Sequence, residues 1–365
     1  MNLNQKYRVS IVRCESYNKG EVKKALEDSL KNINFEFKKG MKILIKPNIL
    51  APNKPEDAIT THPIVIEELC KVFKKFDAEI FIGDSSGVDT DLALEVSGMI
   101  GLSKYGKIIN FEKIEKKFFR LESKKMDIPL PKIIFDVDLV INIAKMKTHS
   151  LTGVTLCVKN LYGCIPGKLK ETLHRTFSRV NEFSKFLLYI HNKIKPQLNI
   201  IDGIVGIEGE GPSTSGKKIN SKVIVAGKNA IAVDFAGSRF MGFNPNSIYT
   251  NKLSGVKLKE IEIIGNAKDS KLKFKKPKFM FIPFLNTFFP VSKIKFNKKN
   301  CKKCRLCQEK CPVHVICFKP FPECDNKKCI KCLCCMEICP YNAVYLEDHL
   351  IKRILKKLRK FVRGR

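Results

Sequence analysis

The chain has 365 residues, 44% of them hydrophobic, and a formal net charge of +32 at pH 7. This length allows one large α/β domain with a small companion, or two medium domains with a small module, and the composition excludes wholesale disorder. No apolar run approaches the roughly 18 residues of a membrane span, and residues 1–6 carry no secretory signal, so we expect a cytoplasmic protein without a transmembrane segment.

Strand and helix patterns alternate along residues 1–267. Short apolar runs predict strands, and segments with apolar residues at helical spacing predict helices between them. Such alternation is typical of an α/β fold, with a largely parallel sheet covered by helices on both faces. The predicted strands are 9–12, 43–45, 80–82, 139–143, 198–201, 223–226 and 261–264, and the predicted helices are 21–30, 63–76 and 173–194.

Polar residues follow four of these strands directly, and in open α/β sheets ligands bind beyond the carboxyl ends of the strands. The pattern predicts a site for an anionic small molecule, in which lysines orient the anionic groups and acids or histidines move protons. The candidate catalytic residues are His149, Asp84, Asp202, His62 and Lys159. The candidate substrate-binding residues are Lys46, Asn48, Ser85, Lys145, Lys147, Asn160, Glu208 and Glu210.

Several of these residues have a structural alternative. Asp84 and Asp202 could cap turns, because Asp and Gly favour turns. His62 follows Thr61 just before a proline, where a threonine is expected to cap a helix, and the helix dipole would favour a neutral imidazole there. His174 falls in a helical surface pattern and is expected to have no role in the site.

A glycine-rich segment, residues 203–216, follows the strand at 198–201. Its last part, Gly211–Lys217, is similar to the phosphate-binding pattern G-x4-G-K, but Lys218 stands where that pattern needs Ser or Thr. We therefore do not expect nucleotide hydrolysis at this loop. The glycines are expected to bring backbone close to a ligand or to another chain segment.

Two segments beyond residue 267 do not follow the α/β pattern. Residues 268–295 mix lysines, phenylalanines and prolines, which is typical of a linker whose aromatics pack between domains, with an exposed aromatic patch for a partner as the alternative. Residues 347–365 carry apolar residues at helical spacing with basic residues on the other face. This amphipathic helix could dock on its own domain, or on a membrane surface or a partner.

Eight cysteines define the chemistry of residues 296–346. They form two runs with the spacing C-x2-C-x2-C-x3-C-P, in which three thiolates of a run bind one 4Fe–4S cluster and the fourth reaches the other cluster. A zinc ribbon would use only four cysteines, and a disulfide framework does not suit a long chain without a signal peptide. The spacing therefore predicts two 4Fe–4S clusters, the first bound by Cys301, Cys304, Cys307 and Cys339, and the second by Cys329, Cys332, Cys335 and Cys311.

The two runs belong to a longer repeat of 28 residues, which places Cys311–Ile316 on Cys339–Val344. Over residues 296–346 the chain resembles dicluster ferredoxins, which implies a small α+β module. Three further cysteines of this region are interpreted as small residues beside the clusters, with alternative ligation as the other possibility. They are Cys317, Cys324 and Cys334.

The positive charge is concentrated in the last third of the chain. Residues 251–300 contain thirteen lysines against three acids, and residues 301–365 contain sixteen basic residues against six acids. Basic surfaces attract nucleic acids, anionic lipids or acidic proteins. Because Lys outnumbers Arg by 57 to 11 and no nucleic-acid motif is present, we expect an acidic redox protein, such as a ferredoxin or a redox-enzyme subunit, and not a nucleic acid.

Several motifs of residues 40–240 resemble the family catalogued as domain of unknown function 362, which is often fused to dicluster ferredoxins. They include Lys46-Pro-Asn48, Gly83-Asp84-Ser-Ser-Gly87, and residues 142–149 and 158–163. The resemblance implies a cytoplasmic iron–sulfur protein and supplies no settled reaction. The order of His149, Lys159, Pro166-Gly167 and His174 is also similar to nickel-pincer lactate racemases, in which a lysine holds the cofactor and histidines act as base and ligand.

These patterns predict an iron–sulfur oxidoreductase that passes electrons through two 4Fe–4S clusters, to or from an anionic small molecule bound in the α/β domain. The alternatives are an electron carrier or cofactor-assembly factor without substrate chemistry of its own, and a racemase-like nickel enzyme.

Overall fold

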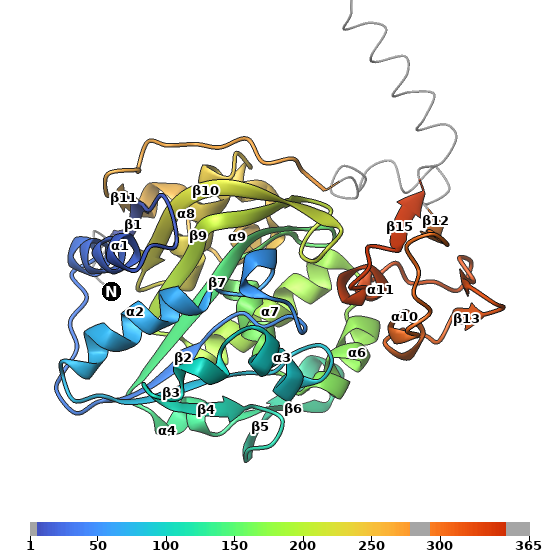
Figure 1. Ribbon diagram of the computed structural model, residues 1–365, viewed down its shortest axis with the longest axis horizontal. Coiled ribbons are helices and arrows are strands. Elements are labelled where there is room, and N and C mark those ends of the chain that lie inside the picture. Colours follow the sequence, from blue (N-terminus) through green and yellow to red (C-terminus); the bar gives the residue numbers. More distant parts are fainter. Residues whose placement is uncertain (1–5, 278–292, 348–365) are drawn as a thin grey trace, which may run out of the picture.

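The computed structural model describes residues 6–277 and 293–347 of the chain. Residues 7–277 form a large α/β unit, and residues 293–347 form a small cysteine-rich unit beside it (Figure 1). The first residues of the predicted linker, 268–277, pack on the large unit, where Phe274 is buried and its N–H donates to the carbonyl of Met241 at 3.1 Å. The rest of that linker up to residue 292, and the predicted C-terminal helix beyond Glu347, lie outside the described residues.

The large unit is built on one nine-stranded sheet. From β9 through β7, β2 and β3 to β4 all neighbours are parallel, as are β1 and β11, whereas β10 is antiparallel to both β9 and β1. The predicted α/β fold with a largely parallel sheet is confirmed. In sheet order the strands are β11 (Ile261–Ile264), β1 (Tyr7–Arg13), β10 (Gly216–Gly227), β9 (Leu198–Gly209), β7 (Leu139–His149), β2 (Lys42–Lys46), β3 (Glu79–Asp84) and β4 (Lys107–Asn110), and β8 (Gly153–Thr155) pairs with the end of β7.

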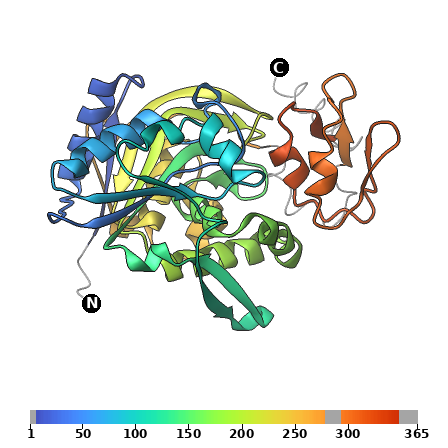
Figure 2. The same ribbon diagram turned by 60° about the horizontal axis from the view of Figure 1, so that its bottom comes forward.

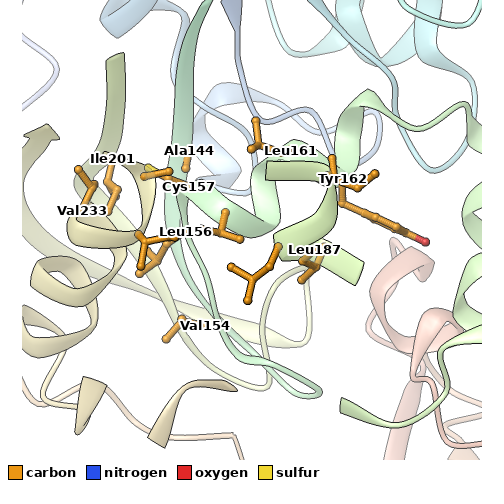
Figure 3. Close-up of a cluster of buried hydrophobic side chains, with 14 of the residues drawn as sticks. Ala144, Val154, Leu156, Cys157, Leu161, Tyr162, Leu187, Ile201 and Val233 are labelled. Carbon is orange, nitrogen blue, oxygen red and sulfur yellow. The ribbon is translucent and has the colours of Figure 1, made fainter. Parts of the chain in front are cut away.

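Helices cover both faces of this sheet, because alternate residues of each strand point to opposite sides. Ile43 and Ile45 of β2 belong to one core cluster, and Leu44 between them belongs to the other. The first cluster packs against α1 (Lys19–Asn32), α2 (Pro63–Lys74) and α3 (Thr90–Val96). The second packs against α4 (Ile133–Asp136), α5 (Cys157–Asn160), α6 (Gly167–Thr176), α7 (Val180–Ile194), α8 (Ala230–Phe240) and α9 (Tyr249–Leu253), and Figure 3 shows part of it.

Smaller elements complete the large unit. The antiparallel hairpin of β5 (Lys116–Leu121) and β6 (Met126–Pro131) projects from the body of the molecule, as Figure 2 shows. Short 3-10 helices lie at η1 (Pro55–Asp57), η2 (Ile100–Leu102), η3 (Glu122–Lys124), η4 (Leu161–Cys164), η5 (Pro245–Ser247) and η6 (Leu258–Glu260). None of the helices in the described ranges combines the length and the apolarity that a membrane span requires.

Some predicted elements differ from the structure. The single helix expected over 173–194 is two helices, α6 and α7, because Phe177 between them leaves the helical conformation, with φ −115° and ψ 57°. This break allows Phe177 to stack on Phe186 of α7, with ring centroids 4.6 Å apart. Strands β7 and β9 run longer than predicted, because β9 continues into a hairpin with β10 and the end of β7 pairs with β8.

The cysteine-rich unit consists of two small antiparallel ladders and two short helices. β12 (Lys293–Phe296) pairs with β15 (Val344–Glu347), and β13 (Ile316–Phe318) pairs with β14 (Pro322–Cys324). Helices α10 (Leu306–Glu309) and α11 (Cys334–Ile338) each follow a cysteine loop. The 28-residue repeat is present in the backbone, since positive φ values recur in the pairs Lys303/Lys331, Arg305/Leu333 and His314/Asn342.

Helix α11 faces the large unit in both views (Figures 1 and 2). The hydroxyl of Thr214, in the glycine-rich loop between β9 and β10, donates to the carbonyl of Cys339 at 2.7 Å. Lys310 forms an ion pair with Glu171 of α6 at 3.0 Å. A Cβ at Gly211 of the same loop would lie 2.4 Å from the carbonyl oxygen of Thr148. The glycines therefore allow a close approach between chain segments.

Candidate functional site

The carboxyl ends of β9, β7, β2 and β3 lie along one edge of the sheet, because these strands are parallel neighbours. Lys46 ends β2 and Asp84 ends β3, while Lys145 of β7 lies opposite Asp202 of β9. The structure thus brings the main strand-end candidates to one edge, as expected. Their side chains form two separate groups there.

The first group is built on a buried ion pair between Lys46 and Asp84. The ammonium lies 2.7 Å from Oδ1 of the carboxylate, and both side chains are 1% exposed. The other carboxylate oxygen accepts the N–H of Ile49 at 2.8 Å. Gly163 lies over the pair, and a Cβ there would be 2.3 Å from Oδ1 of Asp84 and 2.6 Å from Nζ of Lys46. Because the two charges neutralise each other, neither is free to bind a ligand.

The second group joins Lys145, Asp202, Tyr17 and His62. Oδ2 of Asp202 accepts from Nζ of Lys145 at 2.8 Å and from the N–H of His62 at 3.0 Å, and Oδ1 accepts the hydroxyl of Tyr17 at 2.9 Å. The rings of Tyr17 and His62 stack with centroids 3.8 Å apart. Burial lowers the pKa of Lys145, and it lowers the pKa of His62 to about 4. Both oxygens of the Asp202 carboxylate therefore accept hydrogen bonds within the protein, and the one from the N–H of His62 anchors the start of α2.

The cap of α2 differs from the expectation of a threonine. His62 itself is the N-cap, since its Nδ1 accepts the N–H of Ile64 at 3.3 Å. Thr61 has another role, because its hydroxyl donates to the carbonyl of Ile143 at 2.8 Å and accepts the N–H of Asn48 at 2.9 Å. His62 is therefore explained by local structure.

A cavity of about 110 Å³, called the central cavity here, lies between the first group and the cysteine-rich unit. Residues of α5, α6 and the strand ends line one side, and Cys334, Glu337 and Ile338 of α11 line the other. The predicted candidates in its lining are Asn48, Asp84, Ser85, Lys147, Lys159 and Asn160. The candidates outside its lining are Lys46, His62, Lys145, His149, Asp202, Glu208 and Glu210.

Two lysines of the central cavity are held by neutral oxygen atoms. Lys147 donates to Oδ1 of Asn48 at 2.6 Å and to the carbonyl of Ile59 at 2.7 Å. Lys170 donates to the carbonyl of Ser85 at 2.7 Å and to that of Ser86 at 2.9 Å. Burial lowers the pKa of Lys147 well below its usual value, and that of Lys170 to about 8.

Three polar groups in the lining lack a partner among the residues that the structure describes. Oγ1 of Thr155 and Nδ1 of His174 have no hydrogen bond, although the two residues are only 4% and 6% exposed. The ammonium of Lys159 makes no hydrogen bond or ion pair, and lies 5.9 Å from the ring centre of Tyr162. Burial lowers the pKa of Lys159, and that of His174 to about 4. Buried polar groups normally find partners, so these three mark a place for a polar ligand.

His149 connects the end of β7 to α11. Its Nδ1 accepts the N–H groups of Leu151 at 3.0 Å and Thr152 at 3.3 Å, which places the proton of the neutral ring on Nε2. Nε2 lies 2.9 Å from Oε1 of Glu337. Burial lowers the pKa of His149 to about 4. His149 therefore contacts a cavity residue without lining the cavity.

Helix α5, which carries Lys159 and Asn160, is held by an acid from a distant element. The two carboxylate oxygens of Asp234, on α8, accept the N–H of Cys157 at 2.7 Å and that of Val158 at 3.0 Å. Burial raises the pKa of Asp234 to about 7, against the effect of these two backbone donors. Asp234 thereby positions the helix on which Lys159 stands.

Glu208 and Glu210 lie on the β9–β10 hairpin, beyond the strand-end edge. Glu208 accepts the N–H of Lys275 at 2.8 Å, and Glu210 lies 3.4 Å from the hydroxyl of Ser150. They were predicted as site residues because the sequence does not indicate how far β9 extends.

Two further cavities lie inside the cysteine-rich unit. All fifteen cysteines are free of disulfides. No three His, Cys, Asp or Glu side chains within residues 6–277 and 293–347 converge on a single metal ion, whereas each thiolate of a 4Fe–4S cluster binds a different iron. Cys301, Cys304, Cys307 and Cys339 line one cavity, and Cys311, Cys329, Cys332 and Cys335 line the other, with Cys324 as a fifth cysteine there.

Several residues that line the central cavity were not among the predicted site residues, although the similarity to lactate racemases had named His174. His174 was placed on a surface, but it packs between Tyr162 and Phe183 with ring centroids 5.3 Å and 4.8 Å away. A signal was available for two of them, since Lys170 and His174 are four residues apart and share one face of α6. The residues that were not predicted include Thr155, Lys170, His174 and Glu337.

Residues 43–239, more than half of the chain, match the family model described as Domain of unknown function (DUF362). The chain is 30% identical over 248 residues to the Thylakoid-associated protein sll1697 of Synechocystis sp., covering 66% of this chain and 77% of that protein. The solved lactate racemase apoprotein from Thermoanaerobacterium thermosaccharolyticum aligns with 18% identity and a TM-score of 0.39, over 62% of this chain and 55% of that one, which is too distant to support an argument. On the family match and this relative, the protein belongs to the DUF362 family.

Proposed function

We propose that this protein is an iron–sulfur oxidoreductase, which exchanges single electrons with an acidic redox protein and acts on a small anionic molecule in the central cavity. The position of α11 carries the proposal. This helix lines the central cavity with Cys334, Glu337 and Ile338, and it also holds Cys335 of the second cysteine set. A molecule in the cavity would therefore be separated from that set by one short helix.

The two cysteine sets fit two 4Fe–4S clusters. Each set lines its own cavity, and the two loop-and-helix halves that together carry the sets have the same backbone conformations. When bound, each cluster supplies a centre that gains or loses one electron. The first would be held by Cys301, Cys304, Cys307 and Cys339, and the second by Cys311, Cys329, Cys332 and Cys335.

The unpartnered groups of the central cavity support an anionic ligand. Lys46 and Lys145 were expected to orient anions, but their charges are neutralised by Asp84 and Asp202. Lys159 makes no ion pair with a described residue, although the carboxylate of Glu337 in the same lining attracts its charge. Unlike the ammonium groups of Lys147 and Lys170, that of Lys159 donates no hydrogen bond within the described residues, so we assign the bound anion to it.

Thr155 and His174 supply the remaining contacts in this proposal. The hydroxyl of Thr155 can donate to an oxygen of the ligand, and Nδ1 of His174 can donate or accept according to its tautomer. His174 is accordingly the residue best placed to exchange a proton with the bound molecule, with Lys159 as its orienting group.

Metal analysis tests the first half of the proposal. After anaerobic purification we expect about eight iron and eight sulfide ions per chain, which is the content of two cubanes. About four of each, or none, would contradict two clusters. Nickel in the same analysis would favour the racemase-like alternative.

Ligand-dependent stability tests whether a small anionic molecule binds in the central cavity. A panel of small carboxylates and inorganic oxyanions is added to the anaerobic protein, and a ligand at 100 times its Kd raises stability by about 2.7 kcal/mol. In Lys159→Gln this stabilisation should be lost with iron content unchanged, whereas Lys24→Gln, an exposed lysine on α1, should keep it. If no anion stabilises the iron-loaded wild type, the electron-carrier or assembly-factor alternative is favoured.

A further inference from the structure

The two halves of the cysteine-rich unit share a backbone but differ in chemistry. Residues 301–305 and 329–333 form loops with positive φ values at the same two positions. In the first loop one of these positions is Arg305, which is exposed, and in the second it is Leu333, which is 1% exposed. Since the conformation is the same, the contrast in side chains is not required by the fold of the loop.

The two cysteine cavities differ in the same way, because the lining of the first contains basic residues and the lining of the second contains none. The first is lined by Lys302, Arg305 and Tyr341 among others, and Cys304 beside it is exposed. The second has no charged residue in its lining, which consists of cysteines, Pro312 and aliphatic side chains. The first set therefore has one exposed cysteine and basic residues in its cavity lining, whereas the second has an uncharged lining and includes Cys335 of α11, the helix that lines the central cavity.

Five exposed basic residues lie within residues 298–305, the segment that carries Cys301 and Cys304 of the first set, and are called the basic rim. None of them forms an ion pair with a residue in the described ranges, and the exposed acids of residues 293–325 are Glu309, Glu323 and Asp325. The basic rim consists of Lys298, Lys299, Lys302, Lys303 and Arg305.

Aromatic rings hold part of the basic rim in place. Lys298 and Lys303 both lie over the ring of Phe321, at 5.6 Å and 4.6 Å from its centre, and Arg305 lies 5.7 Å from the centre of Phe318. Cation–π contacts of this kind order the charges.

We propose that the basic rim is the docking surface for an acidic one-electron carrier protein, which exchanges its electron at the first cysteine set. The inference rests on the proposed function of that set. In each encounter the carrier is oxidised by one electron as this protein is reduced by one, or the reverse, and no proton or chemical group is transferred. The central cavity is lined by none of the rim residues, so the docking surface for the partner and the cavity for the small molecule are made of different residues.

Charge reversal on the rim tests the docking surface. The probe is a plant-type 2Fe–2S ferredoxin, an acidic one-electron carrier, and its association with the full iron-loaded chain is measured by calorimetry at low salt. The rim variant is Lys298→Glu with Lys303→Glu, which leaves the cysteine-cavity linings intact. The control is Lys23→Glu with Lys24→Glu, two exposed lysines of α1, which changes the net charge equally.

We expect the wild type to bind the ferredoxin with an affinity that falls as salt rises, because the contact is electrostatic. The rim variant should bind at least about tenfold more weakly, and the control should stay within about twofold of the wild type. Equal binding by the two variants, no association of the wild type at low salt, or displacement of the ferredoxin by a short DNA duplex at physiological salt would each overturn the inference. Iron and sulfide content is measured on the same samples, so failure of the cluster proposal is separated from failure of docking.

Discussion

Replacing Gly163 by alanine should disrupt the buried ion pair that ends β2 and β3. The added Cβ would lie 2.3 Å from Oδ1 of Asp84 and 2.6 Å from Nζ of Lys46, about 1 Å inside ordinary contact distances. Both side chains are only 1% exposed, so neither can move into water. The methyl group must therefore separate the two charges or displace the helical turn that carries residue 163.

The expected loss in the free energy of unfolding follows from the burial of the Lys46–Asp84 ion pair. Breaking a buried ion pair costs about 3–5 kcal/mol, because uncompensated charges remain in a medium of low polarity. Overpacking without loss of the pair would cost only about 1–3 kcal/mol. The larger value should apply here, since the nearest atoms are the charged atoms themselves, and it corresponds to a fall in Tm of roughly 5–10 °C for a large domain.

Thermal and urea unfolding of the anaerobic protein measure the effect. Gly101→Ala is the matched control, because a Cβ at Gly101 meets no atom within 4 Å. That variant should stay within about 1 kcal/mol of the wild type. If Gly163→Ala also unfolds within 1 kcal/mol of the wild type, the close approach to the ion pair is not rigid and the reasoning fails.

Three further substitutions test other contacts of the site. The raised pKa of Asp234, about 7, means that the folded protein holds a proton that the unfolded chain releases near pH 4, so this carboxyl lowers stability as pH rises from about 4 to 7. Asp234→Asn should therefore gain stability relative to the wild type between pH 5 and pH 7.5 in urea unfolding, and a constant difference would contradict the raised pKa. Lys145→Met should cost about 3–5 kcal/mol by leaving Asp202 unpaired, and adding Asp202→Leu should recover part of it in a double-mutant cycle; additive losses would show that the pair is not coupled. Lys310→Ala removes the ion pair with Glu171, whose side chains are 24% and 27% exposed, and should change stability by less than about 1 kcal/mol; a larger loss would mean that this contact holds the two units together.

Much of the strand-end edge could be predicted from the sequence, because strand boundaries and the polar residues after them are local patterns. Asp84, Lys147, Lys159 and Asn160, all predicted site residues, line the central cavity. The sequence could not tell a paired charge from a free one. Lys46 and Lys159 look equivalent as residues, yet only the packing shows that Lys46 has a carboxylate partner.

The sequence by itself determined the α/β class, the 28-residue repeat and the two cysteine sets, since periodicity and spacing depend on residues close together in the chain. The tertiary structure decided that α11 closes the central cavity and that Glu337 meets His149, 188 positions earlier in the chain. It also decided that Asp234 holds α5 and that His174 is buried, contrary to its surface pattern. Contacts of this kind depend on which distant elements pack together, and that is set by the burial of apolar surface over the whole chain and not by any local pattern.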